Sequence, residues 1–216
     1  MKSIRKIDFF FEIKSMGLSA ILPLLALLFL VFFNYSELGP EIARKLSIFI
    51  EFVICPLAAW WCMYLFIDYY EDNMGEVLFT YPVSIFFHGV LRALMFLLCF
   101  LALFIICLFL ISQRHEEILF SIQVLQYIPQ SILYGALGFC LIVLTRNIVI
   151  PILCIVGYVA GKYFTGGSKL MPVYNIMFFD IESSYQLLLE KALINIVFAF
   201  LLFVLSHFIL ARRTLI

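Results

Sequence analysis

The uncharged run LMFLLCFLALFIICLFLI, residues 94–111, decides the class of fold. Because a helix rises about 1.5 Å per residue, this run is long enough to cross most of the roughly 30 Å hydrocarbon layer of a bilayer. The rest of the chain has the same character: 65% of residues are hydrophobic and 13% are charged. Soluble domains have about 45–50% and about 25%. The composition therefore predicts an integral membrane protein.

Six such apolar stretches divide the chain, and backbone groups in lipid must be hydrogen-bonded internally, which a helix achieves. We therefore predict an all-α, polytopic membrane protein with six transmembrane helices and one transmembrane domain over residues 1–216. The expected spans are residues 17–34, 46–68, 84–111, 128–145, 147–164 and 188–211.

The distribution of Lys and Arg predicts the orientation, because cytoplasmic loops carry an excess of both. Six spans place both termini on one side, which would hold Lys2, Arg5, Lys6, Lys14, Arg146, Arg212 and Arg213. The other side would hold Arg44, Lys45, Arg114, Lys162, Lys169 and Lys191. The bias is modest, but the basic flank before the first span agrees with it. We expect a multi-pass protein of the cell membrane with both termini in the cytoplasm.

The segment before the first span, KSIRKIDFFFEIKSM at residues 2–16, suits a short interfacial helix. Ile4, Ile7 and Phe11 would share its apolar face, and its basic residues would reach lipid headgroups. An ordinary basic flank without helical structure is the alternative.

An acidic stretch, DYYEDNMGEVLFTYPVS at residues 68–84, interrupts this apolar chain between the second and third spans. It holds four carboxylates and no Lys or Arg, and the predicted orientation places it in the cytoplasm. An apolar stripe at i, i+3, i+4 and i+7 predicts a short amphipathic helix over residues 72–82. Its members are Met74, Val77, Leu78 and Tyr81, opposite Asp72, Glu76 and Thr80, with Phe79 on the polar face. Pro82 would end the helix or bend it. An acidic loop is the alternative.

The order of residues here resembles the permease subunits of type 2 ATP-binding-cassette exporters. An acidic run, Gly75, Glu76, apolar residues and Pro82 precede a span with the early Arg92. The six-span outline and the basic N-terminal segment are similar to that family too. The resemblance implies that this segment is the coupling helix, which docks in a groove of a separate ATPase subunit. The docking residues would be Asp72, Gly75, Glu76, Phe79, Tyr81 and Pro82.

The same resemblance implies the partners and cofactors. This chain would be a translocation subunit without catalytic residues or a cofactor, and the partner ATPase would bind ATP and Mg. A second permease chain, either another copy or a relative, would complete the membrane domain. One departure is that no basic residue accompanies the acidic run, so the detailed ATPase contacts are open.

The segment before the sixth span, residues 165–187, contains Gly166, Gly167 and Pro172 and then the apolar patch VYNIMFF. The patch is too short to cross a bilayer. In the resembled family, short or re-entrant helices lie here on the outer side. An amphipathic surface loop is the alternative.

Polar residues inside spans are candidates for a translocation path, because a buried charge in a bilayer is costly. Glu51 lies about 7–8 Å below the outer end of span two by helical rise, and we expect it to pair with Lys45 or Lys191 or to face a pathway. Arg92 is expected to snorkel to the cytoplasmic headgroups, or to contact substrate. Gln126 and Gln130 are expected to form interhelical hydrogen bonds.

Other chemistries find little support in the sequence. The balance of 14 basic and 14 acidic residues does not suggest a nucleic-acid partner. The chain has no phosphate-loop, nucleophile-elbow or HExxH motif. The cysteines lack the spacing of a zinc site, and the histidines lack an i, i+4 partner, so we predict no metal.

The sequence therefore leaves three functions open. The first is the membrane subunit of an ATP-driven exporter for an amphipathic substrate such as a peptide, antimicrobial or drug-like molecule. The second is a permease for haem, lipid or glycan. The third is a stand-alone membrane enzyme or assembly factor, whose expected cluster of ionisable residues at membrane depth is not visible in the sequence.

Overall fold

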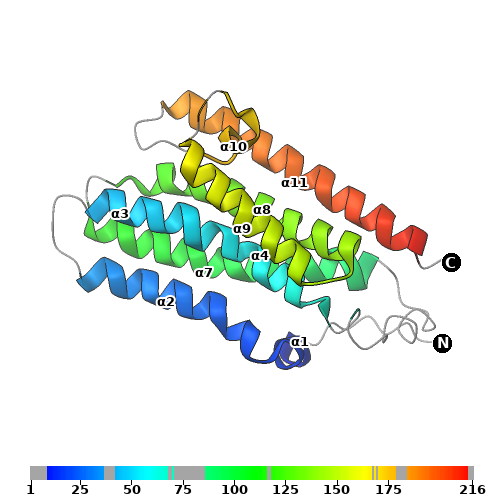
Figure 1. Ribbon diagram of the computed structural model, residues 1–216. Helices are drawn as coiled ribbons and strands as arrows, with labels where there is room; N and C mark the ends of the chain where they lie inside the picture. The colour runs from blue at the N-terminus through cyan, green and yellow to red at the C-terminus, as the bar shows by residue number, and fades with distance from the viewer. Residues whose placement is uncertain are drawn as a thin grey trace.

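The described part of the chain is a bundle of long helices that run side by side (Figure 1). The computed structural model describes residues 9–36, 42–67, 70, 86–115, 118–166, 168, 170–178 and 184–213. Successive apolar helical segments along the chain run in opposite directions, as the ribbon shows (Figure 1). Within these residues all regular structure is helical, which confirms the predicted all-α class.

Five segments are long and apolar enough to cross a membrane, by length and composition, within the described ranges. The first joins a 3-10 turn, η1 (Gly17–Ala20), to α2 (Ile21–Ser36), and the second joins α3 (Ile42–Phe49), the π-helix η2 (Ile50–Ile54) and α4 (Cys55–Tyr64). The third joins the π-helix η3 (Phe87–Leu91) to α7 (Arg92–Arg114). The others are α8 (Phe120–Thr145) and α11 (Tyr185–Arg213). The protein is thus a multi-pass helical membrane protein in class.

The sixth apolar segment is α9 (Val149–Thr165), which has 17 residues. At 1.5 Å per residue it is about 25 Å long, which is less than the roughly 30 Å hydrocarbon layer. A residue with a left-handed backbone conformation lies on each side of α9. These are Arg146, which caps the preceding α8 with φ 54°, and Gly166, which caps α9 with φ 53°. The length of α9 alone therefore does not indicate that this helix crosses the membrane, and the crossing stays a proposal.

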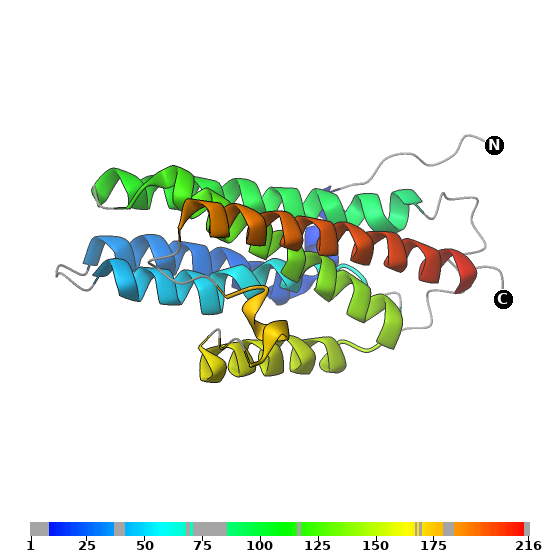
Figure 2. The same cartoon turned by 90° about the horizontal axis from the view of Figure 1, so that it is seen from above.

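Two short helices lie outside the bundle's long axes. α1 (Phe9–Ser15) runs across one end of the bundle, and the last residues of α11 lie at this same end (Figures 1 and 2). We call this end the α1 end and the other the opposite end. The crosswise direction of α1 is the arrangement expected of an interfacial helix. α10 (Pro172–Asn175) lies beside α9.

α8 is the central helix of the bundle. In its most apolar window 67% of the residues are buried, against 28% in the first segment and in α11. It packs against α4, α7, α9 and α11. A tight crossing joins it to α4, where a Cβ on Gly138 would lie 2.8 Å from the Cβ of Ala59. Small residues allow such close approach of two helix backbones.

The fourth span was expected at residues 128–145, but α8 begins earlier, at Phe120, and continues through Pro129. The neighbouring helices bury Gln123, Gln126 and Gln130 of α8. The other helices begin and end within four residues of the predicted spans.

Candidate functional site

The predicted coupling helix lies outside the described residues. Its proposed docking residues, Asp72, Gly75, Glu76, Phe79, Tyr81 and Pro82, all fall between described residues 70 and 86. The ATPase-docking assignment therefore stays a prediction, and the candidate site is built from the membrane-spanning helices.

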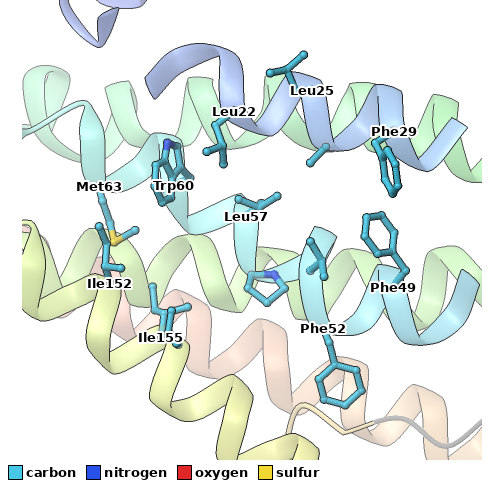
Figure 3. A pocket seen from close by; sticks show the side chains of 14 residues that line it. Leu22, Leu25, Phe29, Phe49, Phe52, Leu57, Trp60, Met63, Ile152 and Ile155 are labelled. Carbon is cyan, nitrogen blue, oxygen red and sulfur yellow. The ribbon is translucent and has the colours of Figure 1, made fainter. Parts of the chain in front are cut away.

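An apolar groove with a volume of about 690 Å³ lies between α2, the α3–η2–α4 segment and α9. Figure 3 shows the side chains from these three segments facing the same space. Trp60 and Met63 lie at one end of the groove, and Phe49 and Phe52 lie toward the other (Figure 3). The lining residues are Leu22, Leu25, Ala26, Phe29, Phe49, Phe52, Val53, Pro56, Leu57, Trp60, Met63, Ile152, Ile155 and Val156.

The chemistry of the lining suits a hydrocarbon group. Among these described lining residues, Trp60 is the one whose side chain can donate a hydrogen bond, and its indole N–H already donates to the Ser19 carbonyl at 2.9 Å. The neighbouring Trp61 donates to the Ala20 carbonyl at 3.0 Å. Both bonds tie α4 to η1. The groove therefore offers mainly apolar contact to an occupant.

A buried ion pair lies beyond the Phe52 end of the groove. The Lys162 Nζ of α9 is 2.8 Å from the Glu51 Oε1 of η2, and the side chains are 0% and 6% exposed. Removing one partner of such a pair leaves an uncompensated buried charge, which costs about 3–5 kcal/mol. The pair thus fixes the C-terminal turn of α9 against η2.

Lys162 was not among the partners expected for Glu51, which were Lys45 and Lys191. Lys191 instead donates to Asn175 Oδ1 at 3.0 Å and to the Phe178 carbonyl at 2.7 Å. Nothing in the residue pattern indicates the register between span two and the end of span five, so Lys162 was counted only among the basic residues of the outer side. Its place just inside an apolar run was the signal that could have indicated burial.

Phe52 connects the ion pair with the groove. Its ring lines the groove, and the ring centroid is 5.0 Å from Lys162 Nζ. The same ring contacts Tyr163 edge-on, with centroids 5.4 Å apart. These contacts lie in the π-helix η2, and π-helical turns inside α-helices are frequent at functional sites.

Arg92 forms a second buried ion pair, at the α1 end. Its guanidinium contacts the Glu12 carboxylate of α1 and lies 5.6 Å from the Phe66 ring centroid. Arg92 is only 4% exposed, so the expectation that it reaches lipid headgroups is wrong. The reason is that α1 supplies a carboxylate, and the Phe9 ring of α1 stacks on Phe96 with centroids 4.7 Å apart.

The predicted polar residues of α8 lie in the core. Gln130 donates a hydrogen bond to the Met177 carbonyl, so it joins α8 to the segment before α11 rather than to another spanning helix. Gln126 is buried one turn earlier. Neither residue lines the apolar groove.

The segment around α10 is partly inserted into the bundle. Met177 is buried, whereas Leu170, Met171 and Val173 are exposed. The Tyr158 hydroxyl donates to the Val173 carbonyl at 2.8 Å, and the Tyr174 ring covers Gly161 so closely that a Cβ there would lie 2.4 Å from it. A re-entrant course is compatible with these contacts and stays a prediction, since residues 179–183 lie outside the described ranges.

Comparison of the chain with protein-family models, with curated proteins and with solved structures finds no match. The geometry thus defines a multi-pass helical membrane protein with an apolar groove and two buried ion pairs, one toward each end of the bundle.

Proposed function

We propose that this chain is the membrane-spanning subunit of an ATP-driven exporter, powered by a separate ATP-binding-cassette ATPase. The complex would contain a second permease chain and six spans per permease, with α9 as the fifth. The coupling helix of residues 72–82 would face the cytoplasm together with both termini. The proposed substrate is amphipathic, such as a peptide, antimicrobial or drug-like molecule; haem, lipid or glycan export is the alternative.

The observation that carries the proposal is the groove. Its volume of about 690 Å³ lies in the range of ligand sites, about 300–1,000 Å³. Its lining is apolar, and it lies between α2, α4 and α9 rather than inside the central packing around α8. Such a site accepts the apolar part of an amphipathic molecule from the bilayer. The acidic segment of residues 68–84, between the second and third spanning segments, supplies a place for an ATPase to act.

Co-purification tests the proposal. The tagged chain is purified from its own membranes, and recovery of a stoichiometric ATPase supports an exporter. Glu76→Ala and Phe79→Ala are expected to abolish substrate-stimulated ATP hydrolysis while the protein stays inserted. Glu190→Ala, which removes an exposed carboxylate on α11, is the matched control and should keep full stimulation. Normal stimulation in both coupling variants would reject the coupling assignment.

One observation favours the stand-alone enzyme as the second candidate. The structure places Glu51 and Lys162 together inside the bundle, and Tyr127 and Tyr134 of α8 are also buried. Clusters of ionisable groups at membrane depth can serve proton transfer. Repeated purification of the chain alone, with a hydrolytic activity that Glu51→Gln abolishes, would favour this candidate over the exporter.

A further inference from the structure

The position of α9 is secured by few buried side chains. Only Pro151, Ile155 and Lys162 are buried among its 17 residues. The helix lies at the edge of the bundle, as the view from above shows (Figure 2). Pro151 lies in its first turn and Ile155 one turn later, so Lys162 is the buried residue nearest its C-terminal end. The contact of Lys162 with Glu51 is therefore the main polar attachment of this half of α9 to η2.

The same attachment borders the groove. Ile152, Ile155 and Val156 of α9 form one wall of the groove, and Phe52 lies near its end (Figure 3). Phe52 also contacts the Lys162 ammonium and the Tyr163 ring. A displacement of the C-terminal turn of α9 would therefore remove the contacts that hold Phe52 in place.

We propose that the Glu51–Lys162 pair is a latch that keeps the Phe52 end of the groove closed, and that separating the pair opens this end to water. This inference rests on the proposed function in one respect, because only in an exporter would the opening of this end control the passage of a substrate. The geometry of the latch itself does not depend on an ATPase or a substrate. Val53 lines the groove next to Phe52 in the middle of the second spanning segment, so in a bilayer its 39% exposed side chain faces hydrocarbon, and a charged reagent reaches it only when water enters the groove.

Thiol labelling measures whether water reaches the groove. Val53→Cys is introduced with Cys154→Ala, which removes the exposed native thiol, and the full chain is placed in lipid nanodiscs. A permanently charged methanethiosulfonate reagent then labels thiols that contact water, from either side of the bilayer. Labelling of the Cys154→Ala parent gives the background. The labelling rate of the thiol introduced by Val53→Cys is expected to be slow while the pair is intact.

Two variants break the latch and leave opposite charges. Lys162→Met leaves the Glu51 carboxylate, and Glu51→Gln leaves the Lys162 ammonium. Both are expected to raise the labelling rate at least tenfold. The residual charge would attract the charged reagent in one variant and repel it in the other. A local charge effect alone therefore predicts that the labelling rate rises in one variant and falls in the other. Arg92→Met breaks the other buried pair, at the α1 end, and should leave the rate unchanged.

An unchanged rate in both variants, or a rise in only one, would overturn the latch. Circular dichroism and gel filtration establish that each variant is folded. If a single variant is not recovered folded, Glu51→Gln combined with Lys162→Met, which removes both charges of the pair, is measured with the same expectation. Failure to find an ATPase partner would reject the exporter and leave this labelling result unaffected.

Discussion

Gly138 of α8 lies directly against Ala59 of α4, where a Cβ at residue 138 would be 2.8 Å from the Ala59 Cβ and 3.0 Å from the Ala59 carbonyl oxygen. One of these neighbours is backbone, which cannot move without shifting α4. Since α8 is the most buried spanning helix of the described chain, this crossing sets the spacing of the centre of the bundle. The backbone of Gly138 is helical, which any residue can adopt, so the close contact with Ala59 is what requires a glycine at this position.

Gly138→Ala should therefore destabilise the protein. Overpacking of a well-packed interior typically costs about 1–3 kcal/mol. Gly157→Ala is the matched control, because Gly157 is also helical but a Cβ there meets no atom within 4 Å. Removing a helical glycine without a clash should be neutral or stabilise the protein by about 0.5–1 kcal/mol. Thermal unfolding of both variants in the same detergent measures the difference, and equal melting temperatures would contradict the tight crossing.

The sequence predicted the helices well because the bilayer imposes a simple rule on them. A long uncharged run such as residues 94–111 must form a helix in lipid, whatever its neighbours are. The beginning of α8 was placed too late because the length rule gives the minimum for a crossing and not where the helix starts. Gln123 and Gln126 precede the predicted start of this span, and only the packing of other helices around α8 shows that they are buried.

The candidate site was less predictable. Glu51 and Arg92 were recognised as unusual from their apolar surroundings, but the partners Lys162 and Glu12 were not. An ion pair requires the rotation and depth of two helices, and periodicity within one helix does not give their relation to another. The groove was missed for the same reason, because the apolar residues of α2, α4 and α9 are typical of any spanning helix.

Breaking the ion pair at the α1 end should destabilise the protein. Arg92→Met removes the guanidinium from the largely buried Glu12 carboxylate, and such losses cost about 3–5 kcal/mol. Arg114→Met, at the other end of α7, removes a partly exposed guanidinium that lies 4.9 Å from the Tyr35 ring and should cost about 1 kcal/mol or less. Thermal unfolding distinguishes the two variants. If Glu12→Gln in the Arg92→Met background restores stability, the unpaired charge of Glu12 causes the destabilisation. If it does not, the lost packing of the Arg92 side chain is the cause.

The crossing of the membrane by α9 can be tested at its two ends. Asn147 precedes α9 and Leu170 follows it, and both are exposed. In a Cys154→Ala background and in sealed vesicles of one orientation, Asn147→Cys and Leu170→Cys should react with an impermeant maleimide from opposite sides. The short length of about 25 Å then requires local thinning of the bilayer. Reaction of both thiols from the same side would show that α9 does not cross.

Gln130 should hold the segment around α10 against the bundle. Gln130→Leu removes the hydrogen bond to the carbonyl of buried Met177, and losing such a bond costs about 1–3 kcal/mol. The segment should then open more often, so chymotrypsin should cleave after Leu170 or Tyr174 faster than in the unaltered protein. Gln113→Leu, which changes an exposed glutamine at the end of α7, is the control and should not change the cleavage rate. Equal cleavage of the Gln130 variant and the control would mean that other contacts, such as the Tyr158–Val173 hydrogen bond, suffice to hold the segment.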